Sequence, residues 1–581
     1  MTASTDRPVV SASVSTDGRD SPGRRWDPRD PDATEIPGER VSAFADDALG
    51  TGDATDVAHR IASGEISAAE AVEAAIARVE AVQRRLNGLQ FEDFDRARRR
   101  AATVPTRGDA VAAFAGVPGA FKDNVTVAGM PLTMGSRAVV PRRLSTDGGV
   151  VKQILDTGMI PIGSTTCPEF GWTATTERVG GDVTRNPWHT GYSSGGSSGG
   201  SAAFVASGAL PLAHANDGGG SLRIPAAACG LVGLKMSRGR TLGDPSTADT
   251  PVKVVNDGVL TRSVRDTARM VAALEQRYRN PRLQPVGEVE GPGARRLRVG
   301  VTIDSPVGPA TDAPTRAAVE ATRALLDDLG HDTVDFAPPV PRFFKSDFED
   351  YWALLAFAIS KNGRKQFGPG FDATRLDPLT LGLAQRFSRR ILKAPLVLAR
   401  LQASSRAYER SIADVDLVLT PVLSHQTPPI GYLSADQPFE DHFRRLVDYC
   451  CFTPLHNATG APAISLPLGA TADGLPVGVM VSGRGGGGRP GHRLGAQYAD
   501  SLLGREARQN GYAGAAGVGA RRRPALPVAG RPGSDRRSGD HLLNRHDYAS
   551  LRRDGDGNSF LSGGGVQRPA FRRQPGCGMP A

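Results

Sequence analysis

The chain has 581 residues, enough for one large enzyme domain of roughly 450 residues with additional ends, or for several smaller domains. It contains no run of about 18 apolar residues, and residues 1–20 are mainly polar and lack the apolar stretch of a signal peptide, which predicts a cytoplasmic protein with neither a membrane-spanning helix nor a secretory signal. The net charge is +9, but residues 484–581 hold 17 Arg, no Lys and seven acidic residues, so this tail carries +10 and the rest −1. A polyanion partner is therefore conceivable only for the tail.

The first half of the chain shows one extended region followed by regular elements. Residues 1–40 are rich in Asp, Arg, Pro, Ser and Thr without periodicity, which predicts disorder. Ser67 and Glu70 form a capping box before apolar residues at helical spacing up to Leu86, which predicts an amphipathic helix. Residues 150–163 read as a helix followed by a short strand at 159–162.

The second half alternates in the same way before its composition changes. Residues 297–335 read as strand, helix and strand, and residues 417–419 and 463–468 as buried strands, so an α/β sheet covered by helices is expected. Residues 340–412 are helical in pattern and rich in aromatics, which fits either core packing or an insertion that lines a substrate entrance. After residue 483 the hydrophobic period is lost in an Arg- and Gly-rich tail.

Two segments rich in glycine and serine lie close together near the middle of the chain. The first is Gly-Tyr-Ser-Ser-Gly-Gly-Ser-Ser-Gly-Gly-Ser at 191–201, and the second is Asp-Gly-Gly-Gly-Ser at 217–221. Such runs are usually linkers, but the apolar residues 202–215 between them indicate a buried location. Consecutive glycines allow backbone N–H groups to converge on one point, as oxyanion stabilisation requires, and Ser221 ends such a turn like a nucleophile.

A nucleophilic serine needs a base, and histidine is the familiar one. The Gly-x-Ser-x-Gly pattern of α/β-hydrolases starts at 191, 195 and 196, but residues 185–190 do not read as the buried strand that should precede it. A lysine can replace histidine if burial keeps it neutral, and Lys122 ends the apolar segment 116–121, although alone it reads as a surface lysine. The histidines expected to be structural are His214, His331, His425 and His456.

Taken together, these segments resemble the amidase signature family. The family's motifs match Lys-Asp-Asn at 122–124, Gly-Gly-Ser-Ser-Gly-Gly at 195–200 and Asp-x-Gly-Gly-Ser-x-Arg-x-Pro at 217–225. The intervals of 75 residues from Lys122 to Ser197 and of 24 residues from Ser197 to Ser221 are also similar to those of family members. The resemblance extends over about residues 41–483 and includes the mycobacterial AmiC-type amidases and the nylon-oligomer amidases.

The resemblance implies a fold and a reaction. The expected fold is a central twisted mixed β-sheet covered by helices on both faces, with residues 340–412 as a helical insertion. The expected reaction is hydrolysis of a monocarboxylic acid amide to a carboxylate and ammonia or an amine, through an acyl-enzyme on Ser221. Ser197, which follows a cis peptide bond in this family, and Lys122 would relay the proton.

Further residues carry over from the same motifs. Backbone N–H groups of Gly218, Gly219 and Gly220 would hold the oxyanion. Supporting roles would fall to Ser198, Asp217 and Arg223. The resemblance implies a small-molecule amide substrate, no metal or organic cofactor, no membrane or specific nucleic-acid partner, and a monomer or homodimer. The five scattered cysteines independently suggest neither a disulfide framework nor a metal site.

Two departures keep other interpretations open. Met236 replaces the proline usual after Gly-Leu-Lys, and residues 484–581 replace a covering helix with a tail that is either disordered or read out of frame. An amidase-like scaffold with impaired catalysis, binding polyanions through its tail, is therefore one alternative. The other is a glutamine-hydrolysing amidotransferase subunit, although Ile224 stands where those subunits tend to carry glutamine. The intact triad favours the amidase.

Overall fold

The computed structural model describes residues 36–105, 111–180, 183–247, 250–289, 291, 295–338 and 340–484, all within the first of the chain's two units, residues 1–517. Residues 1–35 of the extension predicted to be disordered and residues 485–581 of the predicted tail lie outside these ranges. Residue Glu39 is described, and its carbonyl accepts a hydrogen bond from the Thr190 N–H at 2.9 Å.

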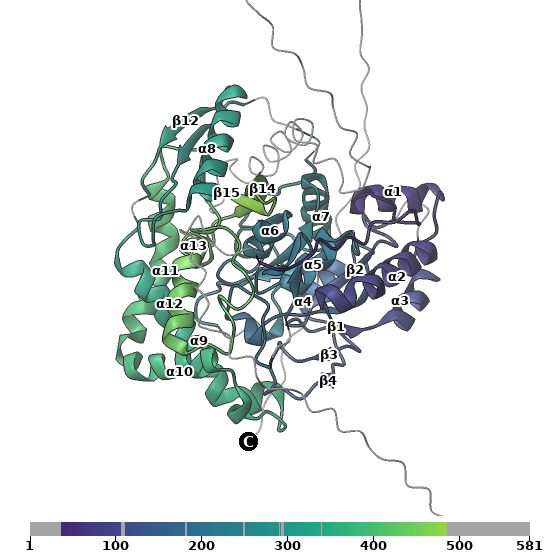
Figure 1. Ribbon diagram of the computed structural model, residues 1–581, viewed down its shortest axis with the longest axis horizontal. Coiled ribbons are helices and arrows are strands. Elements are labelled where there is room, and N and C mark those ends of the chain that lie inside the picture. Colours follow the sequence, from purple (N-terminus) through teal and green to yellow (C-terminus); the bar gives the residue numbers. More distant parts are fainter. Residues whose placement is uncertain are drawn as a thin grey trace, which may run out of the picture. The chain divides into compact units, whose positions relative to one another are not determined.

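The helices and strands alternate along most of the chain (Figure 1). The helices are α1 (Ala54–Ser63), α2 (Ala68–Leu86), α3 (Phe94–Ala101), α4 (Gly149–Leu155), α5 (Gly199–Ala206), α6 (Arg223–Cys229), α7 (Val264–Arg277), α8 (Ala313–Asp328), α9 (Phe343–Phe367), α10 (Pro378–Arg390), α11 (Ala394–Ser411), α12 (Phe439–Tyr449) and α13 (Pro454–Thr459). The strands are β1 (Leu89–Glu92), β2 (Pro118–Lys122), β3 (Pro131–Leu132), β4 (Arg142–Arg143), β5 (Ile160–Thr165), β6 (Arg185–Asn186), β7 (His189–Ser193), β8 (Leu212–Asp217), β9 (Val232–Lys235), β10 (Asn256–Thr261), β11 (Arg298–Val301), β12 (Asp332–Asp335), β13 (Leu417–Pro421), β14 (Ala463–Ala470) and β15 (Pro476–Ser482).

The main sheet has eight strands in the order β12-β11-β13-β15-β14-β9-β10-β8. Strand β11 runs parallel to β12 and β13, and the other pairs are antiparallel, so the sheet is mixed. A smaller sheet has the order β1-β5-β2, and its strand β2 contacts β8 at the edge of the main sheet. This contact brings the end of β2 next to the turn that follows β8.

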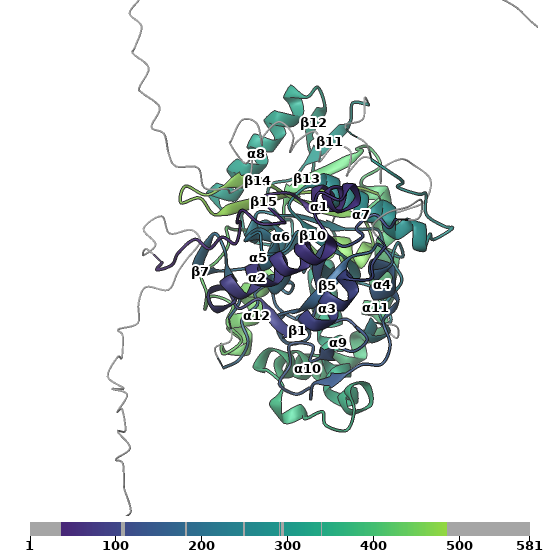
Figure 2. The same ribbon diagram turned by 90° about the vertical axis from the view of Figure 1, so that its right-hand side faces the viewer.

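Helices cover both faces of the main sheet. Successive side chains of a strand point to opposite faces, so one strand can contact helices on both sides. In β15, Val477, Val479 and Val481 pack in one cluster with residues of α8, whereas a Cβ at Gly478 would lie 2.5 Å from Ala227 of α6. Figures 1 and 2 both show α8 on one side of β14 and β15 and α6 on the other. The predicted mixed sheet with helices on both faces is confirmed.

The predicted local elements also agree with the structure. The Ser67 hydroxyl accepts the Glu70 N–H at 3.1 Å, the Glu70 carboxylate accepts the Ser67 N–H at 2.8 Å, and α2 follows. Residues 150–163 form α4 and β5, and residues 297–335 form β11, α8 and β12. Residues 340–412 contain α9, α10 and α11, so this segment is helical as predicted.

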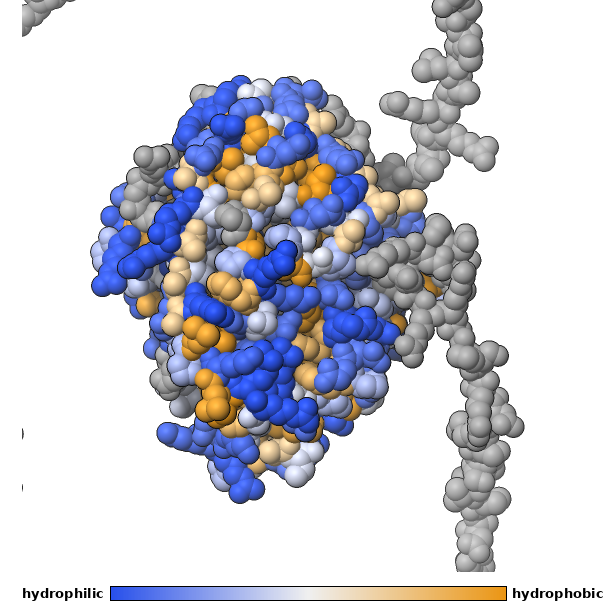
Figure 3. Space-filling model, turned by 90° about the vertical axis from the view of Figure 1, so that its left-hand side faces the viewer, coloured by the Kyte–Doolittle hydropathy of each residue, from blue (hydrophilic) through white to orange (hydrophobic). Residues whose placement is uncertain are grey.

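The outer surface on the side of α9 to α12 is mainly hydrophilic, with apolar residues scattered among charged ones (Figure 3). Large apolar side chains that are exposed include Phe343, Ile391, Leu392 and Leu396. In the part of the chain that the structure describes, no helix combines the length and the apolar character needed to cross a membrane.

Candidate active site

Lys122 is the last residue of β2 and is only 1% exposed. Its Nζ lies 2.6 Å from Ser197 Oγ and 2.8 Å from Asn216 Oδ1, and Asn124 in turn donates to the same Asn216 oxygen at 3.1 Å. Burial lowers the pKa of Lys122 to about 8, because the contacts of Nζ are a hydroxyl and an amide rather than a carboxylate. The side chain can therefore lose its proton near neutral pH.

Ser197 follows a cis peptide bond after Gly196 and lies two residues before α5. Gly171 approaches it closely: a Cβ at Gly171 would lie 2.8 Å from Ser197 Oγ, and its φ of +73° belongs to the left-handed region. Only glycine fits there without displacing the hydroxyl. The neighbouring Ser198 hydroxyl donates to the Asn216 carbonyl at 3.4 Å, which ties the serine run to β8.

Ser221 ends the turn between β8 and α6 and is 7% exposed. Among the described residues no hydrogen bond joins its hydroxyl to Ser197, although both serines are buried in the same region. Catalytic hydrogen bonds in enzymes without ligand are often long and shorten when substrate binds. The structure therefore provides a Lys122–Ser197 pair already in contact and a second serine at the surface of a pocket.

In the glycine turn before Ser221, one backbone N–H group donates a hydrogen bond to a side chain of the protein. Gly220 N–H donates to the Asp217 carboxylate at 2.7 Å, and the Thr453 hydroxyl donates to the Gly219 carbonyl at 2.6 Å. The N–H groups of Gly218, Gly219 and Ser221 have no acceptor among the described residues. These three groups, rather than Gly220, remain available to a bound oxyanion.

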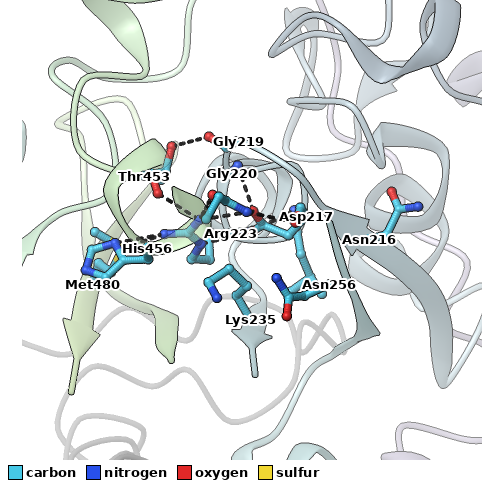
Figure 4. A network of polar contacts seen from close by, with 12 residues as sticks. Asn216, Asp217, Gly219, Gly220, Arg223, Lys235, Asn256, Thr453, His456 and Met480 are labelled. Atoms are coloured by element: carbon cyan, nitrogen blue, oxygen red, sulfur yellow. Dashed lines mark hydrogen bonds and ion pairs between the residues drawn. The ribbon is translucent and has the colours of Figure 1, made fainter. Parts of the chain in front are cut away.

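Arg223, at the first turn of α6, anchors this loop from below (Figure 4). Its guanidinium contacts the Asp217 carboxylate at 2.9 and 3.0 Å and donates to the Thr453 carbonyl at 3.0 Å and to Asn457 Oδ1 at 2.7 Å. Asn457 also donates to Asp217 Oδ1 at 2.8 Å. Asp217 and Arg223 are fully buried, so their ion pair fixes the position of the turn that carries Ser221.

The charge balance of this network follows from its burial. Burial opposes ionisation of Asp217, but the charge and hydrogen bonds of Arg223 outweigh it and hold the pKa of Asp217 well below its usual range. Burial and the charge of Arg223 lower the pKa of Lys235 and of His456 well below their ordinary values. The Arg223–Asp217 pair is therefore surrounded by groups that are held neutral.

Ser221 lines a pocket that we call the aromatic pocket. Trp352 of α9 lies edge-on to Trp172, with ring centroids 5.1 Å apart, and its indole N–H donates to the Trp172 carbonyl at 3.2 Å. The charged residues of the lining already have partners, since Lys345 lies 3.5 Å from Asp448 and Glu349 2.7 Å from Arg386. The residues that line the pocket include Gly171, Trp172, Gly219, Ser221, Ile224, Phe344, Phe348, Trp352, Phe443 and Leu446.

The structure brings all the site residues predicted from the sequence into one region. It places His214 and His456 in packing roles: His214 Nδ1 accepts the Lys122 N–H at 3.4 Å, and His456 Nδ1 lies 3.3 Å from Arg223 Nη1. Within the described ranges, no group of three or more His, Cys, Asp or Glu side chains is arranged to hold a metal ion.

Sequence reasoning missed two partners of the site. Asn216 directly precedes the motif at 217–225, but its contact with Lys122 depends on the contact between β2 and β8, which belong to different sheets, and has no local signal. Thr453 lies 234 residues from the carbonyl that it binds. Only the meeting of distant elements reveals such contacts.

Comparison with known proteins identifies the family of the chain. The Amidase family model matches residues 70–487. AmiC of Mycobacterium tuberculosis is 46% identical over 445 residues, which cover 76% of this chain and 93% of AmiC. The 6-aminohexanoate-cyclic-dimer hydrolase of Paenarthrobacter ureafaciens is 35% identical over 459 residues, which cover 74% and 90% of the two chains.

Solved structures give the same result. A structure of 6-aminohexanoate cyclic dimer hydrolase matches with a TM-score of 0.69 and 32% identity, and covers 79% of this chain and 98% of that one. A bacterial aryl acylamidase of the amidase signature family matches with a TM-score of 0.69 and 25% identity, and covers 80% and 97%. The predicted fold and family are thereby confirmed, and the chain belongs to the amidase signature family of hydrolases.

Proposed function

We propose that this protein hydrolyses a carboxamide to a carboxylate and ammonia or an amine, with Ser221 as nucleophile. The observation that carries the proposal is the 2.6 Å contact between Lys122 Nζ and Ser197 Oγ in a buried site, where burial lowers the pKa of Lys122 to about 8. A lysine with a pKa of about 8 is deprotonated in part of the molecules near physiological pH, and this neutral form can accept the Ser197 proton. Ser197 then accepts the proton of Ser221, and Ser221 attacks the amide carbonyl.

The tetrahedral intermediate carries a negative charge on oxygen. The unengaged N–H groups of Gly218, Gly219 and Ser221 are the donors we assign to it, whereas Gly220 N–H stays with Asp217. When the intermediate collapses, the C–N bond breaks and the relay returns a proton to the leaving nitrogen. Water then hydrolyses the ester on Ser221, and the relay removes the water's proton.

The pocket indicates the class of substrate. Aromatic side chains form much of its wall, and its charged residues are paired with protein groups, so the substrate portion that it takes is apolar. The two structural neighbours are a 6-aminohexanoate cyclic dimer hydrolase and an aryl acylamidase, and the second name supports an aryl group in the substrate. We therefore expect an aryl or alkyl amide of small size, cleaved in the cytoplasm without a cofactor, by a monomer or homodimer.

The test is hydrolysis of a panel of aliphatic amides, aryl amides and glutamine by the full chain. The variants are Ser221→Ala, Ser197→Ala and Lys122→Met, and the matched control is Lys152→Met, an exposed lysine of α4. We expect amine release that is lost in the three site variants and kept in the control.

Three other outcomes would each favour a different reading. A folded wild type that releases nothing would favour the impaired scaffold. Release from glutamine alone would favour the amidotransferase subunit. Activity that survives in Ser221→Ala would exclude the mechanism proposed here.

A further inference from the structure

Three aromatic residues line one face of α9 and form a row that we call the α9 ladder. Phe344, Phe348 and Trp352 are spaced by four residues and so lie on the same face of the helix. The ring centroids of Phe344 and Phe348 are 6.2 Å apart, and those of Phe348 and Trp352 are 5.8 Å apart and stacked. All three rings line the aromatic pocket.

The ladder runs from the catalytic loop to the far end of the pocket. A Cβ at Gly218 would lie 3.4 Å from the Trp352 ring, and a Cβ at Gly219 would lie 3.7 Å from it, so Trp352 adjoins the turn before Ser221. Phe344 lies eight residues earlier, about 12 Å along the helix axis at about 1.5 Å per residue. Phe344 is therefore at the end of the pocket that is distant from the reaction.

Two further cavities lie beyond Phe344, and we call them the rear cavities. One is lined by Val307, Phe344 and Cys451, which also line the aromatic pocket, together with Met480 and others. The second, which is the larger of the two, lies between α9 and α11 and also has Phe344 in its wall. Phe344 is thus a wall residue of all three spaces.

Phe344 is held firmly in this position. It is 8% exposed and packs in a cluster with Phe348, Tyr351, Val397 and Leu401. About two turns further along α9, the Tyr351 hydroxyl donates to the Val252 carbonyl at 2.6 Å, which attaches the helix to the chain before β10. The Phe344 ring is therefore a fixed wall between the aromatic pocket and the rear cavities.

We propose that Phe344 limits the length of the substrate by closing the aromatic pocket against the rear cavities. This inference rests on the proposed amide hydrolysis and narrows its substrate class to compact aryl groups and short alkyl chains. A long chain meets the Phe344 ring, and the rear cavities lie on the other side of that ring. Replacing Phe344 by a small residue joins the spaces and admits the longer chain.

The test measures kcat/KM for 4-nitroanilides of butanoic, octanoic and dodecanoic acid. In the wild type we expect the butanoyl substrate to be preferred over the dodecanoyl one. In Phe344→Ala the ratio of dodecanoyl to butanoyl kcat/KM should rise at least tenfold. The matched control is Phe343→Ala, which changes the neighbouring, 44% exposed ring that lines the larger rear cavity but not the aromatic pocket, and should leave the ratio unchanged.

Phe344→Leu provides a milder variant if Phe344→Ala does not fold, and should raise the ratio by a smaller factor. A ratio that stays at the wild-type value in folded Phe344 variants would overturn the inference, as would a wild type that cleaves dodecanoyl and butanoyl substrates equally well. Failure of the underlying amidase proposal looks different, because no anilide of any length would then be cleaved by any variant.

Discussion

The site contains two buried cations with opposite surroundings. Lys122 Nζ contacts a hydroxyl and an amide oxygen, and its pKa is lowered to about 8. Arg223 contacts the negatively charged Asp217 carboxylate and also donates hydrogen bonds to two neutral oxygen atoms. Burial without a counter-charge makes a base that can change protonation state, whereas burial with a counter-charge makes a fixed support.

Adjacent residues of β8 create this difference. Asn216 faces Lys122 and Asp217 faces Arg223, because successive side chains of a strand point to opposite sides. Figure 4 shows Asn216 well apart from the cluster around Arg223. An amide on one side and a carboxylate on the other therefore decide which cation remains able to accept a proton.

The largest expected effect comes from removing the carboxylate next to Arg223, so that this buried cation, like Lys122, contacts no carboxylate. Asp217→Asn leaves the Arg223 guanidinium buried without its counter-charge, which costs about 3–5 kcal/mol of stability. Thermal or denaturant unfolding would measure this loss. In the double variant Asp217→Asn with Arg223→Met both charges are gone, so it should be more stable than the single variant. If the double variant loses as much stability as the single variant or more, the unpaired charge of Arg223 is not the cause of the loss.

The converse change places a carboxylate next to Lys122. Asn216→Asp is nearly isosteric, and its charge next to Nζ should raise the pKa of Lys122 by about two units, which lowers kcat/KM at pH 7 about 100-fold. Activity should return as pH rises. Asn216→Ala is the control, since it removes the same contact without adding charge, and an Asn216→Asp pH profile that coincides with the wild-type one would refute the electrostatic explanation.

The wild-type pH profile sharpens the contrast without any mutation. The pKa of Lys122 is lowered from 10.5 to about 8, so below that pH the lysine is protonated and cannot accept the Ser197 proton. With a substrate that does not titrate, kcat/KM should fall about tenfold per pH unit below 8 and level off above it. A profile that is flat between pH 6 and 8 would rule out Lys122 as the base.

The smallest expected effect comes from the hydrogen bond between Thr453 and the glycine turn before Ser221. Thr453→Val removes the hydroxyl that donates to the Gly219 carbonyl at 2.6 Å, which should cost about 1 kcal/mol and lower kcat/KM about fivefold. Thr453→Ser keeps the hydroxyl and should remain near the wild-type rate. If Thr453→Val is as active as Thr453→Ser, the position of the turn does not depend on this bond.

Sequence reasoning was strongest where chemistry is local. The capping box predicted the start of α2, and the three matched motifs gave Lys122, Ser197 and Ser221 as candidates because family motifs are short and contiguous. The partners of these residues could not be predicted in this way. Asn216 contacts Lys122 across two sheets, and Thr453 and Met480 approach the Arg223 network from segments more than 200 residues away.

The helical segment 340–412 shows the same limit. Its aromatic content predicted either core packing or a substrate entrance, and in the structure Tyr351 is fully buried whereas Phe348 and Trp352 line the aromatic pocket. Residues of one helix differ in role because they lie on different faces. Composition does not specify which face meets a cavity.

The place of β15 in the main sheet has a consequence for how the chain matures during synthesis. This strand is the last described element in sequence, yet it lies between β13 and β14 and joins the two halves of the sheet. Until residue 482 leaves the ribosome, β13 and β14 each present an unpaired edge, and such edges invite aggregation. Translation that stops before residue 476 would therefore yield two open half-sheets that quality control must remove, rather than a shortened enzyme with partial activity.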